Sequence, residues 1–130
     1  MANVVTIQTI EEGPRNAIIK LTGVLDTSDE ALNNKVIVLN LNPIATQVRI
    51  DHIDYSISGA LEAQLYWDAT TPQIILPLAG RGKMSFWNFG GLQNNAGAGK
   101  TGNIALLTTG WSVGVQTYSI ILELVKQGVQ

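Results

Sequence analysis

Short segments that alternate apolar and polar residues, separated by turns, constrain the fold of this chain more than any other feature. The segments are rich in β-branched and aromatic residues and are bounded by glycine, proline, asparagine or aspartate. No long segment repeats apolar residues at the 3.6-residue period of a helix. About eight strands at this spacing favour an all-β, antiparallel β-sandwich, jelly-roll-like, over an α/β fold, and leave the strand order open.

Residues 47–57 predict a strand that contains an extra residue. Val48 and Ile50 occupy even-numbered positions, whereas Ile53 and Ile57 occupy odd-numbered ones, so in a regular strand the two pairs would point to opposite faces. A strand buries both sets on one face only if a residue near positions 51–52 bulges out of the pairing. The next segment, residues 61–68, alternates without such a break, which predicts a strand with one buried face.

Other segments carry signals of their place in a sheet. Residues 4–10 open the chain and are a candidate edge strand. Pro72 and Pro77 bracket four residues of the segment 73–78 and confine it to an edge, because proline cannot donate to the hydrogen-bond ladder of a central strand. Residues 35–41 are apolar on both faces, which predicts a central strand. Gly23 predicts a weak point or a bulge in the strand that contains it.

Composition points to one domain that meets other proteins. The 130 residues suit a single β-sandwich domain, residues 1–130, with 45% hydrophobic and only 14% charged residues. So few charges leave uncharged surface, which we expect to contact a partner or another copy of the chain. The formal net charge is -2 and the pI is about 5.2, so we expect no nucleic-acid binding.

The sequence lacks the residues of several common sites and targeting signals. It contains no cysteine, which excludes disulfides, zinc–thiolate sites and a thiol nucleophile. Its first residues lack the pattern of a secretory signal, and no apolar run is long enough to span a bilayer. We therefore expect a soluble protein without a membrane partner.

The stretch from Gly80 to Gly110 holds a glycine-rich loop between two apolar strands. Its sequence AGAGKT invites comparison with a phosphate-binding P-loop. Asn94 stands where that motif needs its first glycine, and a predicted strand rather than a helix follows. The stretch is better interpreted as a flexible or interface loop, and we expect no cofactor.

His52, the only histidine, lies between Asp51 and Asp54. A carboxylate beside an imidazole can act as a general base, and the nearby acids also include Glu62. No nucleophile accompanies them, and one histidine with these acids is a poor metal set. We therefore expect no catalytic residues, no metal site and no enzyme activity, and interpret His52 as a histidine at a strand bulge.

The tryptophans and tyrosines allow a second interpretation, a glycan-binding module, because aromatic rings stack on sugar rings. Trp67 and Tyr118 share the parity of aliphatic neighbours, so core packing explains them better. Trp111, in a loop with Gly110 and Gly114, is the one expected to be exposed.

Polar residues around the glycine-rich loop are the candidates for an interface. Arginine suits interfaces because its guanidinium pairs bidentately with carboxylates. The candidate contact residues are Arg81, Lys83, Asn94, Asn95, Lys100 and Trp111.

Five segments carry a resemblance to a known group of proteins. They read EGPRNAIIKLTGVLD, VRIDHIDYSISG, LYWDA, FWNFGGLQNNAGAGKTGNIALLTTG and YSIILELVKQ. Over nearly the whole chain they resemble small tailed-phage proteins encoded among virion structural genes, and in particular capsid decoration, or cement, proteins.

That resemblance implies a β-rich homotrimer that binds the major capsid protein and stabilises the head. It implies a location on the capsid surface of virions assembled in the host cytoplasm. A tail or baseplate component, or a glycan-binding module of the particle, is the alternative. A charge-poor chain without cysteine suits each of these structural roles.

Overall fold

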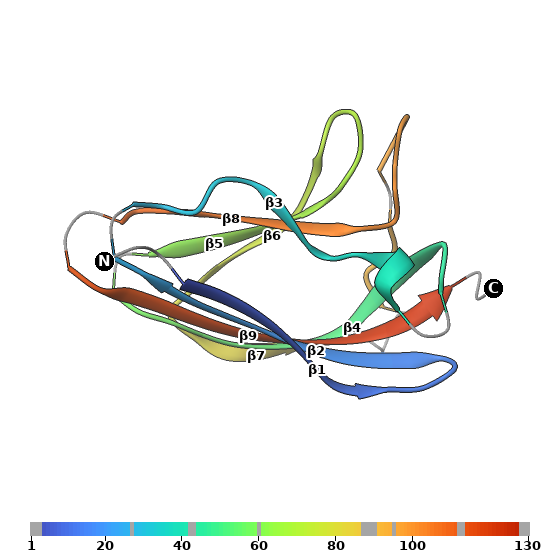
Figure 1. Cartoon of the computed structure of the whole chain (residues 1–130), viewed down its shortest axis with the longest axis horizontal. Helices are drawn as coiled ribbons and strands as arrows, with labels where there is room; N and C mark the ends of the chain where they lie inside the picture. Colours follow the sequence, from blue (N-terminus) through green and yellow to red (C-terminus); the bar gives the residue numbers. More distant parts are fainter. Residues whose placement is uncertain are drawn as a thin grey trace.

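A computed structural model shows two antiparallel β-sheets packed face to face (Figure 1). It describes residues 4–26, 28–41, 44–59, 61–86, 91–94, 96–111 and 114–127. The five-stranded sheet contains, in spatial order, β1 (Val4–Glu12), β2 (Asn16–Leu25), β9 (Gln116–Gln127), β4 (Gln47–Ile57) and β7 (Arg81–Ser85). The four-stranded sheet contains β3 (Asn33–Val36), β8 (Ile104–Thr109), β5 (Glu62–Trp67) and β6 (Gln73–Ala79). The predicted all-β sandwich is confirmed, with nine strands in the described residues.

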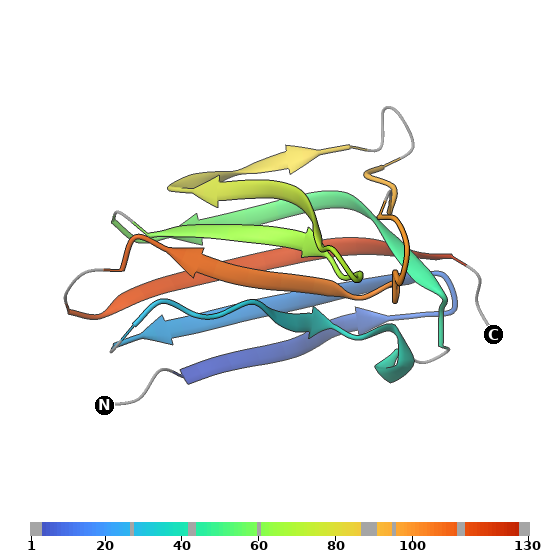
Figure 2. The ribbon, with the colours of Figure 1, turned by 90° about the horizontal axis from the view of Figure 1, so that it is seen from above.

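The strand order is that of a jelly roll with one strand added. From β2 to β9 the chain crosses between the sheets at every connection except the β5–β6 hairpin, which gives the orders β2-β9-β4-β7 and β3-β8-β5-β6. β1 extends the first sheet through a hairpin with β2. As a result the last strand, β9, lies in the middle of its sheet between β2 and β4 (Figure 2). Segments far apart in sequence therefore share one sheet face.

The core lies between the two sheets and is apolar. Alternate residues of β9 and β5 point into it, as their sequences predict. β4 changes parity through a register shift between Ile50 and His52, which confirms the predicted bulge. The inward residues of these three strands are Val48, Ile50, Ile53, Ile57, Ala63, Leu65, Trp67, Tyr118, Ile120, Leu122 and Leu124.

Gly23 occupies a close contact rather than a bulge. The pairing of β2 with β9 runs without a shift through Gly23 and Tyr118, so of the two alternatives predicted there, a weak point or a bulge, the bulge is wrong. The Tyr118 ring lies over the glycine and fills the space that a side chain would need. A glycine in a strand marks either a bulge or a close approach, and here it marks the second.

Residues 35–41 do not form the predicted central strand. β3 ends at Val36 on the edge of the four-stranded sheet, and a 3-10 helix, η1 (Val38–Asn40), follows. The side-chain oxygen Oδ1 of Asn103 accepts the backbone N–H of Val38, at 2.9 Å, and helps to end the strand. The chain must turn here to reach β4 in the other sheet, and Leu39 is left 71% exposed.

The remaining edge predictions agree with the structure. β1 and β6 lie at sheet edges, as residues 4–10 and 73–78 predict. The apolar strand expected before the glycine-rich loop is seen as β7, and residues 87–90 lie outside the described residues. No helix in the described part of the chain is long and apolar enough to cross a membrane.

Candidate functional site

The basic residues expected at one interface lie at opposite ends of the sandwich. Arg81 and Lys83 are exposed on β7, a free sheet edge, and Arg81 pairs with Ser56 at the end of β4. Lys100 is exposed in a loop held at the far end of β5, where the N–H of Thr70 donates to the carbonyl of Ala98 at 3.3 Å. Figure 2 shows the two regions apart. The structure therefore does not bring these candidates together.

The glycine-rich segment is held against the sandwich at several points. Ile50 and Leu92 exchange two backbone hydrogen bonds, of 3.1 and 2.8 Å. Asn94 is buried, and its Oδ1 accepts the N–H of Ala96 at 3.1 Å. Asn94 is thus not an exposed contact residue, contrary to its expected role, and Asn95 lies outside the described residues.

Trp111 is half-buried rather than exposed. Its indole N–H contacts the carbonyl oxygens of Leu25, at 3.2 Å, and Gly114, at 3.0 Å, and its ring packs against the core. Its backbone N–H donates to Asp29 Oδ1 at 2.9 Å. These contacts hold the indole against the sandwich, so the ring of Trp111 is less available for sugar stacking than that of an exposed tryptophan.

Exposed apolar side chains gather on one side of the sandwich. Eight large apolar side chains are exposed in the described residues, and six of them belong to β1 or to the chain around β3 and η1. β1 and η1 lie on the same side of the molecule in Figure 2. A hollow of about 250 Å³ between β1 and residues 35–41 connects the two segments. We call this surface the apolar edge; its residues are Val4, Ile7, Ile10, Leu32, Leu39 and Ile44.

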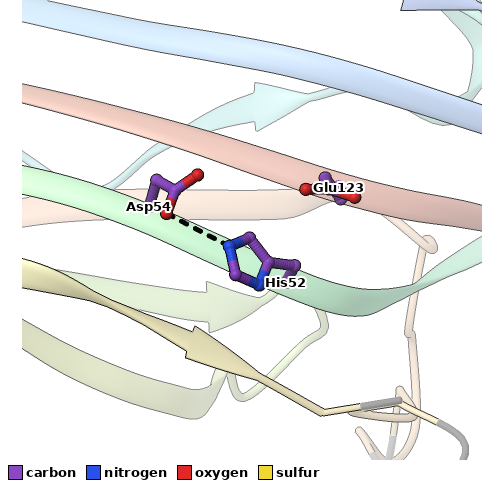
Figure 3. A group of neighbouring side chains, drawn as sticks. All are labelled: His52, Asp54 and Glu123. Carbon is purple, nitrogen blue, oxygen red and sulfur yellow. Dashed lines mark hydrogen bonds and ion pairs between the residues drawn. The ribbon is translucent and has the colours of Figure 1, made fainter.

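A histidine and two carboxylates meet on the outer face of the five-stranded sheet. His52 and Asp54 come from β4, and Glu123 comes from the neighbouring strand β9 (Figure 3). His52 Nε2 lies 3.1 Å from Asp54 Oδ1, and one possible ligand atom from each residue lies within 4.8 Å of the others. His52 is only 9% exposed. In the part of the chain that the structure describes, this group of three side chains is the one that could hold a metal ion.

The bulge in β4 explains this arrangement. Past the register shift, His52 stands directly opposite Glu123 of β9 on one side and Ser85 of β7 on the other. His52 Nδ1 lies 2.7 Å from the Ser85 hydroxyl oxygen. Bulges commonly re-aim a side chain in this way.

Of the three acids that the sequence placed near His52, only Asp54 belongs to this cluster. Glu62 belongs to the other sheet, and Asp51 Oδ1 accepts a hydrogen bond from Arg49 Nε at 3.0 Å. Glu123 is far away in sequence. It is the only acidic residue of β9, and only the strand order places it beside His52.

A second polar cluster lies between the sheets and was not foreseen from the sequence. The Glu30 carboxylate accepts hydrogen bonds from the Tyr118 hydroxyl, at 2.6 Å, and from the Lys35 ammonium. Tyr118 and Lys35 are 1% and 5% exposed. Burial, and then the hydrogen bond to Glu30 and its negative charge, raise the pKa of the Tyr118 hydroxyl far above its ordinary range. The tyrosine therefore stays neutral and acts as a hydrogen-bond donor.

Comparison of the chain with known protein families, with curated proteins and with solved structures finds no match.

Proposed function

We propose that this chain is a non-enzymatic structural protein of a tailed-phage virion, a capsid decoration protein that binds the major capsid protein. In this proposal it assembles as a homotrimer on the capsid surface, in the host cytoplasm. The observation that carries the proposal is the apolar edge, because exposed apolar side chains that gather on one side of a soluble domain commonly mark a protein–protein contact.

The edge strand itself favours contact with another chain. Among the strands that the structure describes, β1 pairs only with β2. Residues 4–10 carry no charge, although charged side chains are the usual protection of a free sheet edge. Val4 and Ile10 are both 54% exposed, and Leu39 extends the surface onto η1. A second copy or the shell can bury these side chains, and it can also pair with the free backbone of β1.

Two further considerations support the proposal as analogies. The sequence segments resemble tailed-phage virion proteins, and the jelly roll is an architecture that viral capsid proteins use. Lectins and other domains use the same architecture, so the fold alone does not decide the function. The contacts of Trp111 weigh against the glycan-binding alternative.

The proposal is tested with heads assembled from the major capsid protein of the same genome, prepared without this chain. Purified protein should co-sediment with them up to a fixed ratio and should raise the temperature at which they break open. Light scattering should give three times the chain mass of 14.0 kDa. Binding to tails or tail intermediates alone would refute the capsid role and favour the tail or baseplate alternative.

A matched pair of variants tests the apolar edge. Ile7 on β1 and Ile74 on β6 are exposed to similar extents, 47% and 44%, on different sides of the molecule. Ile7→Lys should weaken binding to heads or trimer formation at least about tenfold, because it places a charge in an apolar contact. Ile74→Lys should leave both unchanged. Equal effects of the two substitutions would contradict the assignment.

A further inference from the structure

We propose that His52, Asp54 and Glu123 form a binding site for a divalent transition-metal ion such as Zn²⁺ on the outer face of the five-stranded sheet. The inference does not depend on the proposed virion role. It rests on the geometry of the three side chains, on the contact that orients the imidazole and on the charge around the site.

The ligand atoms already lie near the spacing that a metal requires. Zinc binds histidine nitrogen and carboxylate oxygen at about 2.0–2.2 Å, so tetrahedral ligand atoms lie about 3.5 Å apart. His52 Nε2 and Asp54 Oδ1 are 3.1 Å apart, and the largest separation in the set is at most 4.8 Å. A rotation of the Glu123 side chain that moves its carboxylate by about 1 Å brings the three ligand atoms to the separation of tetrahedral ligands.

The imidazole is held in the way that metal-binding histidines usually are. A ligating histidine generally donates its second ring N–H to a neighbouring group, which sets the tautomer and the ring orientation. Here the Ser85 oxygen lies 2.7 Å from His52 Nδ1 and can accept that proton. His52 Nε2 then directs its lone pair towards the Asp54 carboxylate, and a cation between them satisfies both groups.

Negative charge surrounds the site. Asp54 and Glu123 supply two carboxylates to one imidazole. Glu123 also lines a hollow of about 90 Å³ together with Glu11 and Asp51. Cations lie near the site too: Lys83 stands opposite Asp54 in the pairing of β7 with β4, and Arg49 Nε donates to Asp51 Oδ1 at 3.0 Å. A divalent ion offsets more of the like-charge repulsion than one lysine does.

The ligand set selects the class of metal. Mg²⁺ and Ca²⁺ prefer oxygen ligands alone, whereas an imidazole nitrogen with carboxylates suits Zn²⁺ and related transition metals. Three protein ligands leave a fourth position for water or for a group from another molecule. The site joins β4 to β9, so an ion bound there links two central strands.

The test uses the full-length protein without a histidine tag, freed of metal with a chelator. Calorimetric titration with ZnSO₄ should show one saturable site per chain. Co²⁺ should give the visible absorption of a low-symmetry nitrogen–oxygen site, and an excess of Mg²⁺ should not displace it. Binding of Mg²⁺ as tight as that of Zn²⁺, or more than one equivalent site, would overturn the proposal.

Conservative variants separate metal binding from folding. Asp54→Asn and Glu123→Gln keep side-chain size and should weaken Zn²⁺ binding by at least about tenfold, while Ser85→Ala should weaken it by about 10- to 100-fold through the imidazole. Glu62→Gln is the control, because Glu62 is also a half-buried strand carboxylate but lies in the other sheet. Lys83→Ala should leave affinity unchanged or raise it. Unaltered affinity in both Asp54→Asn and Glu123→Gln would refute the site.

Discussion

Substitution of Gly23 by alanine should destabilise the fold strongly, although the change adds only one methyl group. The new Cβ atom would lie 2.5 Å from Cζ and 2.8 Å from Cδ2 of Tyr118, and closer still to Cε2. Carbon atoms pack comfortably at about 3.5–4.0 Å, so the ring would have to move by roughly 1 Å or more. Tyr118 is 1% exposed, and its hydroxyl is bonded to Glu30, so it has little room to move.

The expected loss in the free energy of unfolding is about 3 kcal/mol. Overpacking of a filled core costs about 1–3 kcal/mol. Displacement of the ring also weakens the hydrogen bond between Tyr118 and Glu30, and bonds to a charged group contribute about 1.5–3 kcal/mol. Alanine returns about 0.4–1 kcal/mol, because it restricts the unfolded chain more than glycine does.

Chemical and thermal unfolding at one protein concentration measure this loss. A loss of about 3 kcal/mol lowers the melting temperature of a domain of this size by roughly 10 °C. Gly82→Ala is the control, because Gly82 also faces a tyrosine across a strand pair. There the nearest atom is the Tyr55 hydroxyl oxygen, at 3.0 Å, and the tyrosine is only half-buried. The outer end of that side chain can move aside, so Gly82→Ala should change stability by less than about 1 kcal/mol.

The result that would refute this reasoning is a Gly23→Ala protein within about 0.5 kcal/mol of the parent, the range of neutral surface changes. Equal losses in Gly23→Ala and Gly82→Ala would also contradict it. The double variant Gly23→Ala, Tyr118→Leu gives an independent check. In the Tyr118→Leu background, which lacks the ring, Gly23→Ala should cost much less free energy of unfolding than it does in the parent protein.

Other predictions concern the buried polar contacts. Lys35→Met should cost about 3 kcal/mol, because it leaves the Glu30 carboxylate buried without its cation, and denaturant unfolding measures the loss. Tyr118 has its pKa raised by folding, so its contribution to stability is complete below its ordinary pKa of 10.0 and is lost as the pH rises above it. Stability should fall by up to about 1.4 kcal/mol per pH unit there, and Tyr118→Phe should remove this part of the fall. Trp111→Phe should cost about 1 kcal/mol through the lost indole hydrogen bonds, measured by the same unfolding curves.

Local alternation predicted most of the strands correctly, because each strand buries one face and the side chains of a strand alternate between faces. The same rule located the bulge in β4, since the inward residues of that strand change from even to odd positions there. The alternation rule was wrong for residues 35–41, where apolar residues on both faces predicted a central strand. Val36 and Val38 are buried, but Leu39 is exposed and a 3-10 helix follows β3. The need to turn towards the other sheet overrides the pattern at that point.

The candidate sites depended far more on long-range placement. The sequence brought forward His52 and Asp54 but missed Glu123, and it grouped Arg81 with Lys100, which the structure separates. Glycine and asparagine content suggested a free loop, whereas backbone bonds to Ile50 hold the segment against the sheet. No local pattern reports such contacts, because their partners come from other strands.

By itself the sequence determined the all-β class, the bulge in β4 and the inward residues of most strands. Each of these follows from side-chain alternation and turn chemistry within about ten residues. The tertiary structure alone decided which strands are neighbours, and so it placed Glu123 opposite His52, Tyr118 over Gly23 and β1 beside η1. Strand order depends on pairing between distant segments that share the same local pattern, and that choice is made only when the two sheets pack.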